Sequence, residues 1–248
     1  TNTFSVGVVR DAIAAESADE DAWSLPVVGE TFDGFLNDIR GQHVGAEHVR
    51  QAFASASASA IHEGSVGGGT GMICHEFKAG IGTASRVVGG YTVGVLVQAN
   101  YGRRNRFCVN GVPVGELLGD RIALPQGRDE SGSIIGIVAT VPQQCNRLAQ
   151  RMGLGVARMG GTAAHSSGDL FFAFATGNRS LDEKGEVSLR MVSDPEMTPF
   201  YEAVIEATEE AILNSMLTAE TMTGRDGNTV YALEPDLLLE ALQTVRRA

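Results

Sequence analysis

A serine stands where a polar loop gives way to an apolar strand. Residues 127–132 are polar, and Ser133 opens the β-branched run 133–141, which is typical of a buried strand. If the Gly132–Ser133 peptide bond were cut, Ser133 would carry a free α-amine beside its own hydroxyl, so one residue would hold a nucleophile and its base. The same junction also fits a serine that only satisfies the end of a strand.

Two further groups of polar residues could take part in acyl transfer. Asn100 ends a strand that is apolar up to Val97; it could be a turn former, or it could direct its side-chain N–H at a developing oxyanion. Ser167 and Asp169 precede the apolar run 170–174, and in extended geometry they share one face. They could orient a nearby amine or hydroxyl, or simply cap their own backbone.

Other catalytic motifs are missing from the sequence. There is no GxSxG elbow, and no motif places a histidine near the candidate serines, so a Ser-His-Asp triad is not supported. The glycine-rich loop 64–71 lacks the lysine of a P-loop and the GxGxxG spacing, and we expect a tight turn or a wall close to a small ligand. The three cysteines have no CxxC spacing, so we expect no disulfide framework, no metal and no other cofactor.

The composition excludes several classes of partner. A chain of 248 residues with 43% hydrophobic and 20% charged residues has the composition of a globular domain. Its formal net charge of -11 argues against nucleic acid as a partner. No apolar run is long enough to span a bilayer, so no membrane partner is expected. The chain begins Thr-Asn-Thr without a Met, and its compartment stays open between cytoplasm and periplasm.

The elements that must position these residues form a mixed order, with helices towards the ends and strands in the middle. We expect helices over 3–16, 46–61, 142–152, 196–218 and 235–247, and strands over 81–88, 91–100, 106–109, 133–141 and 169–176. The pair at 89–90 is Gly-Gly, which predicts a hairpin turn and antiparallel pairing. The last two strands are apolar on both faces and are expected to be covered on both sides. The pattern predicts one α/β domain of stacked sheets with helices outside.

Several long blocks of the sequence resemble one known family. They are residues 67–78, 80–86, 91–100, 132–135, 167–169 and 219–227. Together they resemble the DmpA/BapA family, which comprises L-aminopeptidase D-Ala-esterase/amidases and β-aminopeptidases. The resemblance runs from residue 1 nearly to the end of the chain.

This resemblance implies an α/β fold of four layers, an αββα sandwich similar in layout to the N-terminal-nucleophile hydrolases. It implies a precursor that cleaves itself between Gly132 and Ser133, leaving residues 1–132 as part of an α subunit and 133–248 as a β subunit of the single domain 1–248. Family members carry a further segment before the block that begins this chain, and it is expected to belong to the α subunit. The αβ units are expected to form a homo-oligomer, without a metal.

The resemblance also implies roles for the polar residues. Ser133 matches the nucleophile, and Asn100 matches the asparagine that donates to the oxyanion. Ser167 and Asp169 match a Ser-x-acid pair beside the nucleophile, where some relatives have Glu at the position of Asp169.

Two residues near position 30 align with family positions that lie close to the bound substrate. Glu30 matches a carboxylate that would hold the substrate's ammonium group, which explains a demand for a free amino terminus. Phe32 departs from the pattern, because some relatives carry Tyr there. Without that phenol, the rate and the substrate preference are expected to differ.

The function implied is that of a self-processing serine aminopeptidase, which releases N-terminal residues from small peptides and from aminoacyl amides or esters. One alternative is a self-processing acyltransferase of the ornithine acetyltransferase type, but those enzymes use Thr where this chain has Ser133. Another is an unprocessed homologue without catalytic activity.

Overall fold

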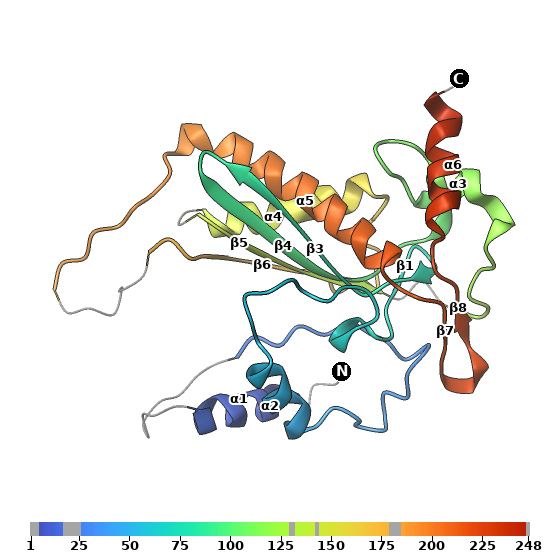
Figure 1. Cartoon of the computed structure of the whole chain (residues 1–248), viewed down its shortest axis with the longest axis horizontal. Helices are drawn as coiled ribbons and strands as arrows, with labels where there is room; N and C mark the ends of the chain where they lie inside the picture. The colour runs from blue at the N-terminus through green and yellow to red at the C-terminus, as the bar shows by residue number, and fades with distance from the viewer. Residues whose placement is uncertain (1–4, 17–25, 129–131, 142–143, 179–184, 247–248) are drawn as a thin grey trace.

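A four-stranded sheet forms the centre of the computed structural model, which describes residues 5–16, 26–128, 132–141, 144–178 and 185–246. Its strand order is β3 (Ile81–Val88), β4 (Tyr91–Asn100), β5 (Ser133–Thr140) and β6 (Leu170–Ala175) (Figure 1). β4 pairs antiparallel with both β3 and β5, whereas β5 and β6 are parallel. The parallel pair is joined through helix α4 (Cys145–Arg158), as a parallel connection requires.

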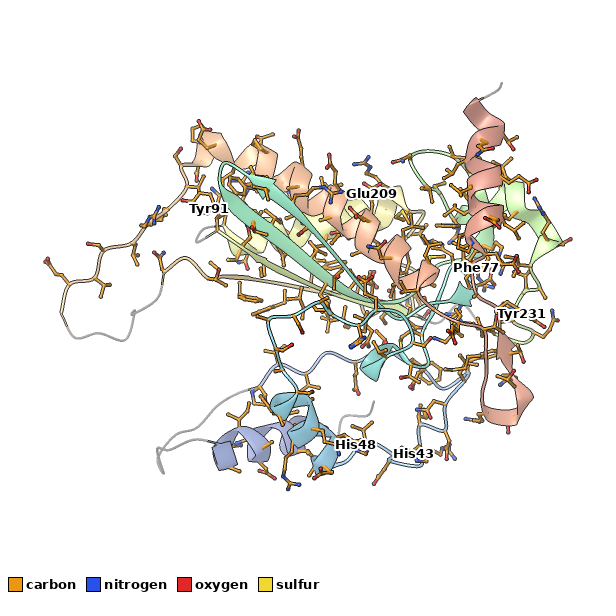
Figure 2. The ribbon with its side chains drawn as sticks, viewed as in Figure 1. His43, His48, Phe77, Tyr91, Glu209 and Tyr231 are labelled. Carbon is orange, nitrogen blue, oxygen red and sulfur yellow. The ribbon has the colours of Figure 1, made fainter. Side chains whose placement is uncertain are left out.

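The hairpin between β3 and β4 is confirmed. Gly89 and Gly90 both have positive φ, 55° and 84°, which is the backbone that a two-residue type I′ turn needs. The turn places Val88 opposite Tyr91 and sets the register of the whole pair. At this end of the sheet, Tyr91 packs edge-on against Phe200, with 6.0 Å between the ring centroids (Figure 2).

Helices α4 and α5 (Thr198–Leu217) lie side by side on one face of the sheet (Figure 1). Alternate strand residues face them and are buried, among them Val93, Val95 and Val97 of β4 and Ile134 and Val138 of β5. Each such side chain contributes roughly 1.5–3 kcal/mol when it is fully removed from water. The apolar alternation of β4 and β5 is therefore satisfied mainly by this helical layer.

The opposite face of the sheet is only partly covered. Near the start of β5 the segment around Gly29 crosses it, since a Cβ at Gly29 would lie 2.9 Å from Ile135 Cγ2. Along β6, three large side chains are exposed on this face: Leu170 (58%), Phe172 (50%) and Phe174 (41%). The expectation that strand 169–176 is covered on both sides is therefore wrong for the described residues, because they leave these three side chains about half exposed.

Smaller elements surround the sheet. Helices α1 (Ser5–Glu16) and α2 (Ala46–Ala54) lie on the side away from α4 and α5 (Figure 1). Helix α3 (Val114–Leu118) contacts α6 (Pro235–Arg246). Two short hairpins complete the strands, β1 (Ile73–Cys74) with β2 (Phe77–Lys78), and β7 (Met222–Thr223) with β8 (Thr229–Val230). Single 3-10 turns occupy residues 67–69, 104–106, 119–121, 194–197 and 225–227.

Several of the expected element bounds need correction, two of them in the first half of the chain. The helix expected over 46–61 ends at Ala54. The strand expected over 106–109 is wrong: residues 104–106 form a 3-10 turn, and Val109 makes only an isolated bridge to Val112. The local pattern does not contain the tertiary contact made by this turn, in which Arg104 is buried with its guanidinium 3.9 Å from the centre of the Phe77 ring (labelled in Figure 2).

The α/β class is confirmed, with strands and helices mixed along the chain. The described residues hold one large sheet and one helical layer of the expected four; they do not include a second sheet of similar size. Helix 142–152 is observed from Cys145 to Arg158, and residues 142–143 lie outside the described residues. None of the helices in the described ranges has the length and apolar character to cross a membrane.

Candidate active site

Ser133 and Asn100 lie next to each other. Ser133 is the first residue of β5 and stands directly opposite Asn100, the last residue of β4, in the antiparallel register. Side chains of directly opposed residues project from the same face, with their Cβ atoms roughly 4.5–5.5 Å apart. The sheet therefore brings the predicted nucleophile and the predicted oxyanion donor together on the face away from α4 and α5.

The Ser167–Asp169 pair lies on the other side of Ser133. The Ser133 Oγ accepts a hydrogen bond from the Gly168 N–H at 3.1 Å. Asp169 Oδ1 accepts from the Ile134 N–H at 3.0 Å and also from the Ser167 hydroxyl. The parallel pairing of β6 with β5 explains this, because it places Leu170 opposite Ile135 and so brings the start of β6 to Ser133.

The Asn100 carboxamide is buried and has a defined orientation. Asn100 is only 1% exposed. Its Oδ1 accepts from the Ile73 N–H at 3.0 Å, and its Nδ2 donates to the Phe32 carbonyl at 2.8 Å. An amide nitrogen has two hydrogens, and the second has no hydrogen-bond partner among the described residues. That N–H is the group available to a developing oxyanion.

Glu30 and Phe32 belong to a segment that is anchored over the strand ends. Between them, Thr31 donates to Met72 Sδ at 2.6 Å and accepts from Gln98 Nε2 at 2.8 Å. Glu30 Oε2 is buried and has no hydrogen-bond partner in the described part of the chain, a costly arrangement unless a ligand supplies a donor. Phe32 is 54% exposed, and its backbone carbonyl accepts the hydrogen bond from Asn100.

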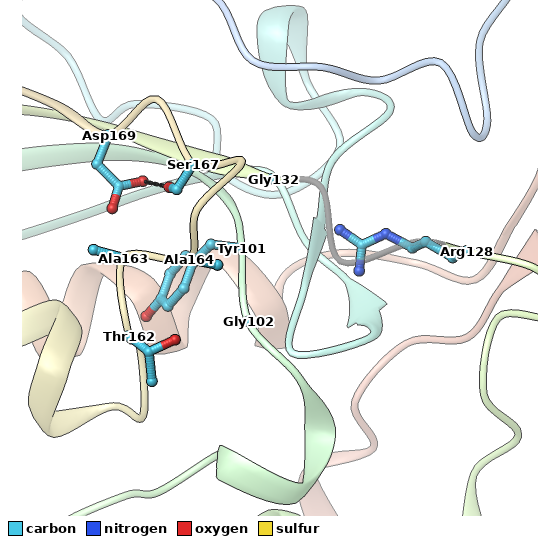
Figure 3. Close-up of a pocket in the computed structure, with 9 residues that line it drawn as sticks. All are labelled: Tyr101, Gly102, Arg128, Gly132, Thr162, Ala163, Ala164, Ser167 and Asp169. Atoms are coloured by element: carbon cyan, nitrogen blue, oxygen red, sulfur yellow. Dashed lines mark hydrogen bonds between the residues drawn. The ribbon is translucent and has the colours of Figure 1, made fainter.

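Two small cavities lie near the strand ends, and Arg128 lines both of them. One, of about 20 Å³, has room for a single water-sized group and is lined by Tyr101, Ser167 and Asp169 among others. Figure 3 shows the Ser167–Asp169 pair on one side of Gly132 and Arg128 on the other. The second cavity, of about 180 Å³, is lined by Phe32, Asp33, Gly34, Phe35, Gly71, Ile73, Asn100, Gly127 and Arg128.

Sequence reasoning missed three groups at this site. They are the Gly168 N–H, the Ile73 N–H and the Arg128 side chain. Gly168 could have been noticed, since it lies between the two residues of the Ser-x-acid pair. The other two have no local signal, because their places depend on tertiary contacts. In the described ranges, no cluster of three or more His, Cys, Asp or Glu side chains could hold a metal ion.

The β1–β2 hairpin supports the chain beyond Asn100. Its two turn residues, His75 and Glu76, have positive φ of 48° and 62°, which is uncommon for residues other than glycine. Hydrogen bonds hold them there: the His75 N–H donates to the Tyr101 carbonyl at 2.7 Å, and the Arg104 N–H donates to Glu76 Oε2 at 2.9 Å. The hairpin is thus fastened to residues that directly follow β4.

The His75 imidazole is buried and neutral. It stacks on Phe107 at 5.0 Å, its Nδ1–H donates to the Arg103 carbonyl at 3.2 Å, and its buried Nε2 has no partner among the described residues. Burial lowers the pKa of His75 from 6.5 to about 4. Because the folded pKa lies below the unfolded one, the unfolded state takes up the proton first, so stability is complete above pH 6.5 and falls as the pH drops towards 4.

A His75→Asn variant should show a weaker loss of stability on acidification than the unchanged protein. Between pH 7 and pH 4, the free energy of unfolding should fall by about 3 kcal/mol more in the unchanged protein than in the variant, or by roughly 6–12 °C more in Tm. Thermal unfolding at the two pH values measures this. Asn accepts positive φ well, and any constant cost of the substitution cancels between the two pH values. Equal acid sensitivity of the two proteins would refute the prediction; a variant of the exposed His62 serves as the control.

The chain matches one protein family and several known proteins over most of its length. The family model described as peptidase family S58 matches residues 1–230. A β-peptidyl aminopeptidase BapA from Sphingosinicella microcystinivorans is 44% identical over 273 residues, which cover 100% of this chain and 69% of that protein.

Two solved structures are similar over nearly the whole chain. The β-aminopeptidase from a Burkholderia species has a TM-score of 0.87 and 48% identity, covering 99% of this chain and 72% of its own. The L-aminopeptidase D-Ala-esterase/amidase from Ochrobactrum anthropi has a TM-score of 0.87 and 37% identity, with the same two coverages. That structure is described as a prototype for the serine aminopeptidases and a new variant of the Ntn hydrolase fold.

Proposed function

Because the chain belongs to peptidase family S58, it is an aminopeptidase, and we propose that it makes its own nucleophile by cleaving the Gly132–Ser133 bond. One observation carries this proposal. Ser133 is the first residue of β5, and it lies between Asn100 on one side and the Gly168 N–H with the Asp169 carboxylate on the other. An acyltransferase of the ornithine acetyltransferase type is not favoured by the family match.

Processing follows from the same hydroxyl. Ser133 Oγ attacks the Gly132 carbonyl carbon, the Gly132–Ser133 C–N bond breaks, and the nitrogen takes a proton to become the α-amine. Water then hydrolyses the resulting ester, which leaves the Gly132 carboxylate and restores the Ser133 hydroxyl. Only glycine fits at position 132, since a Cβ there would overlap the Asn100 carbonyl oxygen.

The two products stay together as α and β pieces, residues 1–132 and 133–248. β4 belongs to the first piece and β5 to the second, and they pair from Gly94–Ala139 to Asn100–Ser133. α5, which also belongs to the second piece, packs on β3 and β4. Cleavage of one loop bond leaves all these contacts in place.

Turnover uses the new amine as the base. Ser133 Oγ attacks the substrate carbonyl while its proton passes to the Ser133 α-amine. An α-amine has a pKa of about 7.7–8.0, so a useful fraction is unprotonated at neutral pH. The substrate's leaving amine takes the proton and departs, and water hydrolyses the acyl-enzyme to release the N-terminal residue.

Two groups assist that step. The second N–H of Asn100 donates to the oxyanion as charge develops on the carbonyl oxygen. Asp169 holds the Ile134 N–H and the Ser167 hydroxyl, and so keeps the backbone next to Ser133 in one position. Ser167 and Asp169 thereby orient the new amine towards the Ser133 hydroxyl.

Glu30 selects substrates with a free amino terminus. Its buried Oε2 lacks a partner among the described residues, and a substrate ammonium would supply the missing donor in a charge-assisted hydrogen bond. Two of the relatives are named for β-amino substrates and one for L-amino substrates. We therefore propose aminoacyl peptides, amides and esters as substrates, with β-aminoacyl compounds included.

A denaturing gel and a substrate panel test the proposal. The gel should show two fragments, and aminoacyl p-nitroanilides of α-L, D and β-amino acids should release p-nitroaniline while their N-acetylated forms should not. A single chain without turnover would overturn the proposal in favour of a non-catalytic homologue. Acetyl transfer from acetylornithine to glutamate would overturn it in favour of an acyltransferase.

The same panel measured on Glu30→Gln tests the ammonium site. We expect kcat/KM for free-amine substrates to fall about 10- to 100-fold, mainly through KM, since a hydrogen bond to a charged group is worth roughly 1.5–3 kcal/mol. Processing should be unchanged, because Gly132 offers no ammonium. Glu47→Gln on the exposed face of α2 removes the same charge and should have no effect. An equal kcat/KM for Glu30→Gln would remove this residue from the site.

A further inference from the structure

A lysine ammonium is buried close to the site and has no part in the chemistry described above. Lys78, in β2, is 0% exposed. Its Nζ donates to three carbonyl oxygens, those of Gly69 (3.4 Å), Met72 (3.1 Å) and Ala79 (2.6 Å). No carboxylate pairs with it among the described residues. Burial lowers the pKa of Lys78 from 10.5 to about 8. A buried cation without a counter-ion is costly, so a role for it is expected.

Two of the three carbonyls, those of Gly69 and Met72, belong to the turn 69–73, which contacts Asn100; the third, that of Ala79, directly follows β2. Met72 immediately precedes Ile73, whose N–H donates to Asn100 Oδ1. The Met72 carbonyl also accepts from the Ala79 N–H at 3.0 Å, so this carbonyl is held from two directions. The position of the Ile73 N–H therefore depends on where the Lys78 ammonium holds the preceding residue.

The Ile73 N–H and the Phe32 carbonyl together decide which way round the Asn100 amide lies. A backbone N–H can meet only the oxygen of a carboxamide, not its NH₂. With the oxygen fixed on the Ile73 side, the NH₂ must face Phe32 O and the region in front of Ser133. With Ile73 displaced, only the Phe32 carbonyl would hold the amide, and its second N–H would no longer be kept in one direction towards the oxyanion.

We propose that Lys78 is a positioning residue for Asn100: its ammonium holds the turn 69–73 so that the Ile73 N–H keeps the Asn100 NH₂ directed at the oxyanion. This inference rests on the proposed function, in which Asn100 stabilises that charge. Lys78 itself touches neither substrate nor nucleophile. A methionine could fill much of the same space, so what lysine adds is three directed hydrogen bonds.

A double-mutant cycle tests the inference. Lys78→Met, Asn100→Ala and the double variant are compared for kcat on one aminoacyl p-nitroanilide, per mole of processed subunit on the gel. We expect Lys78→Met to lower kcat roughly tenfold or more, with KM changed less than about twofold, because only the transition state is affected. The double variant should be no slower than Asn100→Ala alone, because both changes remove the same interaction.

Leu148→Ala provides the matched control. Leu148 of α4 is also 0% exposed, so its truncation destabilises the core without removing a hydrogen bond from the turn 69–73. Its effect on kcat, if any, should multiply with that of Asn100→Ala. Lys78→Gln keeps two N–H donors on a shorter side chain and should fall between Lys78→Met and the unchanged enzyme.

The outcomes separate this inference from the proposed function. If Asn100→Ala keeps its kcat, the oxyanion role fails and this inference fails with it. If Asn100→Ala loses activity but Lys78→Met keeps kcat, or the two effects multiply, the role of Lys78 is refuted while the proposed function stands. If Lys78→Met does not fold, Lys78→Gln takes its place in the cycle with the same two decisive outcomes.

Discussion

Ser133→Ala is expected to remain a single chain of about 26 kDa without aminopeptidase activity. The alanine methyl cannot attack the Gly132 carbonyl, so the ester that precedes cleavage does not form. It also cannot attack a substrate, so even a chain cut by another protease would not turn over. One denaturing gel and one p-nitroanilide assay measure both losses.

Ser133→Thr is the matched control for that experiment. It keeps a hydroxyl at the first position of β5, and a β-branched residue is compatible with a strand. We expect slow but detectable cleavage from this variant and none from Ser133→Ala. Two fragments from purified Ser133→Ala, with termini at residues 132 and 133, would contradict a serine nucleophile.

Asn100→Ala is expected to lower kcat about 10²–10³-fold with little change in KM. Removal of one oxyanion donor usually costs about 2.7–4 kcal/mol in the transition state, and the substrate ground state does not carry the charge that the donor meets. The measurement is steady-state kinetics on a p-nitroanilide, again per processed subunit.

Asn100→Asp removes the oxyanion donor but keeps an acceptor for the Ile73 N–H. Alanine leaves the Ile73 N–H unpaired, which costs roughly 1–3 kcal/mol, whereas an aspartate oxygen can still accept from it at the position of Asn100 Oδ1. The aspartate has no NH₂ and adds a negative charge beside the oxyanion. Because the aspartate cannot donate to the Phe32 carbonyl and carries a buried charge, we expect a lower Tm together with a kcat at least as low as that of Asn100→Ala; a kcat within tenfold of the unchanged enzyme would contradict the role.

Most of the central sheet could be predicted from the sequence. The strands expected over 81–88 and 91–100 are observed with these bounds, and the strand from 133 ends one residue early, at Thr140. Their β-branched alternation and the Gly89–Gly90 turn are local signals, which survive in the fold because the helical layer satisfies the same pattern. At 106–109 the local signal failed, because residues 104–106 form a turn in which Arg104 is buried.

The residues of the site were expected from their types and from the family resemblance, but their neighbours were not. Nothing in the spacing of Asn100 and Ser133 requires them to be opposite each other; the antiparallel register does. In the same way, the parallel pairing of β6 with β5 brings Asp169 to the Ile134 N–H. Register depends on contacts between segments far apart in the chain, which no local pattern contains.

By itself the sequence determined the residue types on which the proposed chemistry rests: a serine that follows a glycine, an amide and an acid, in a chain that belongs to a family of aminopeptidases. The tertiary structure alone decided how that chemistry is held. It placed the Gly168 N–H on the Ser133 hydroxyl, the Ile73 N–H on the Asn100 oxygen and the Lys78 ammonium beneath the turn before Ile73. The physical reason is that residue types and local patterns are already present in the unfolded chain. Hydrogen bonds and burial between distant segments exist only once the sheet has formed.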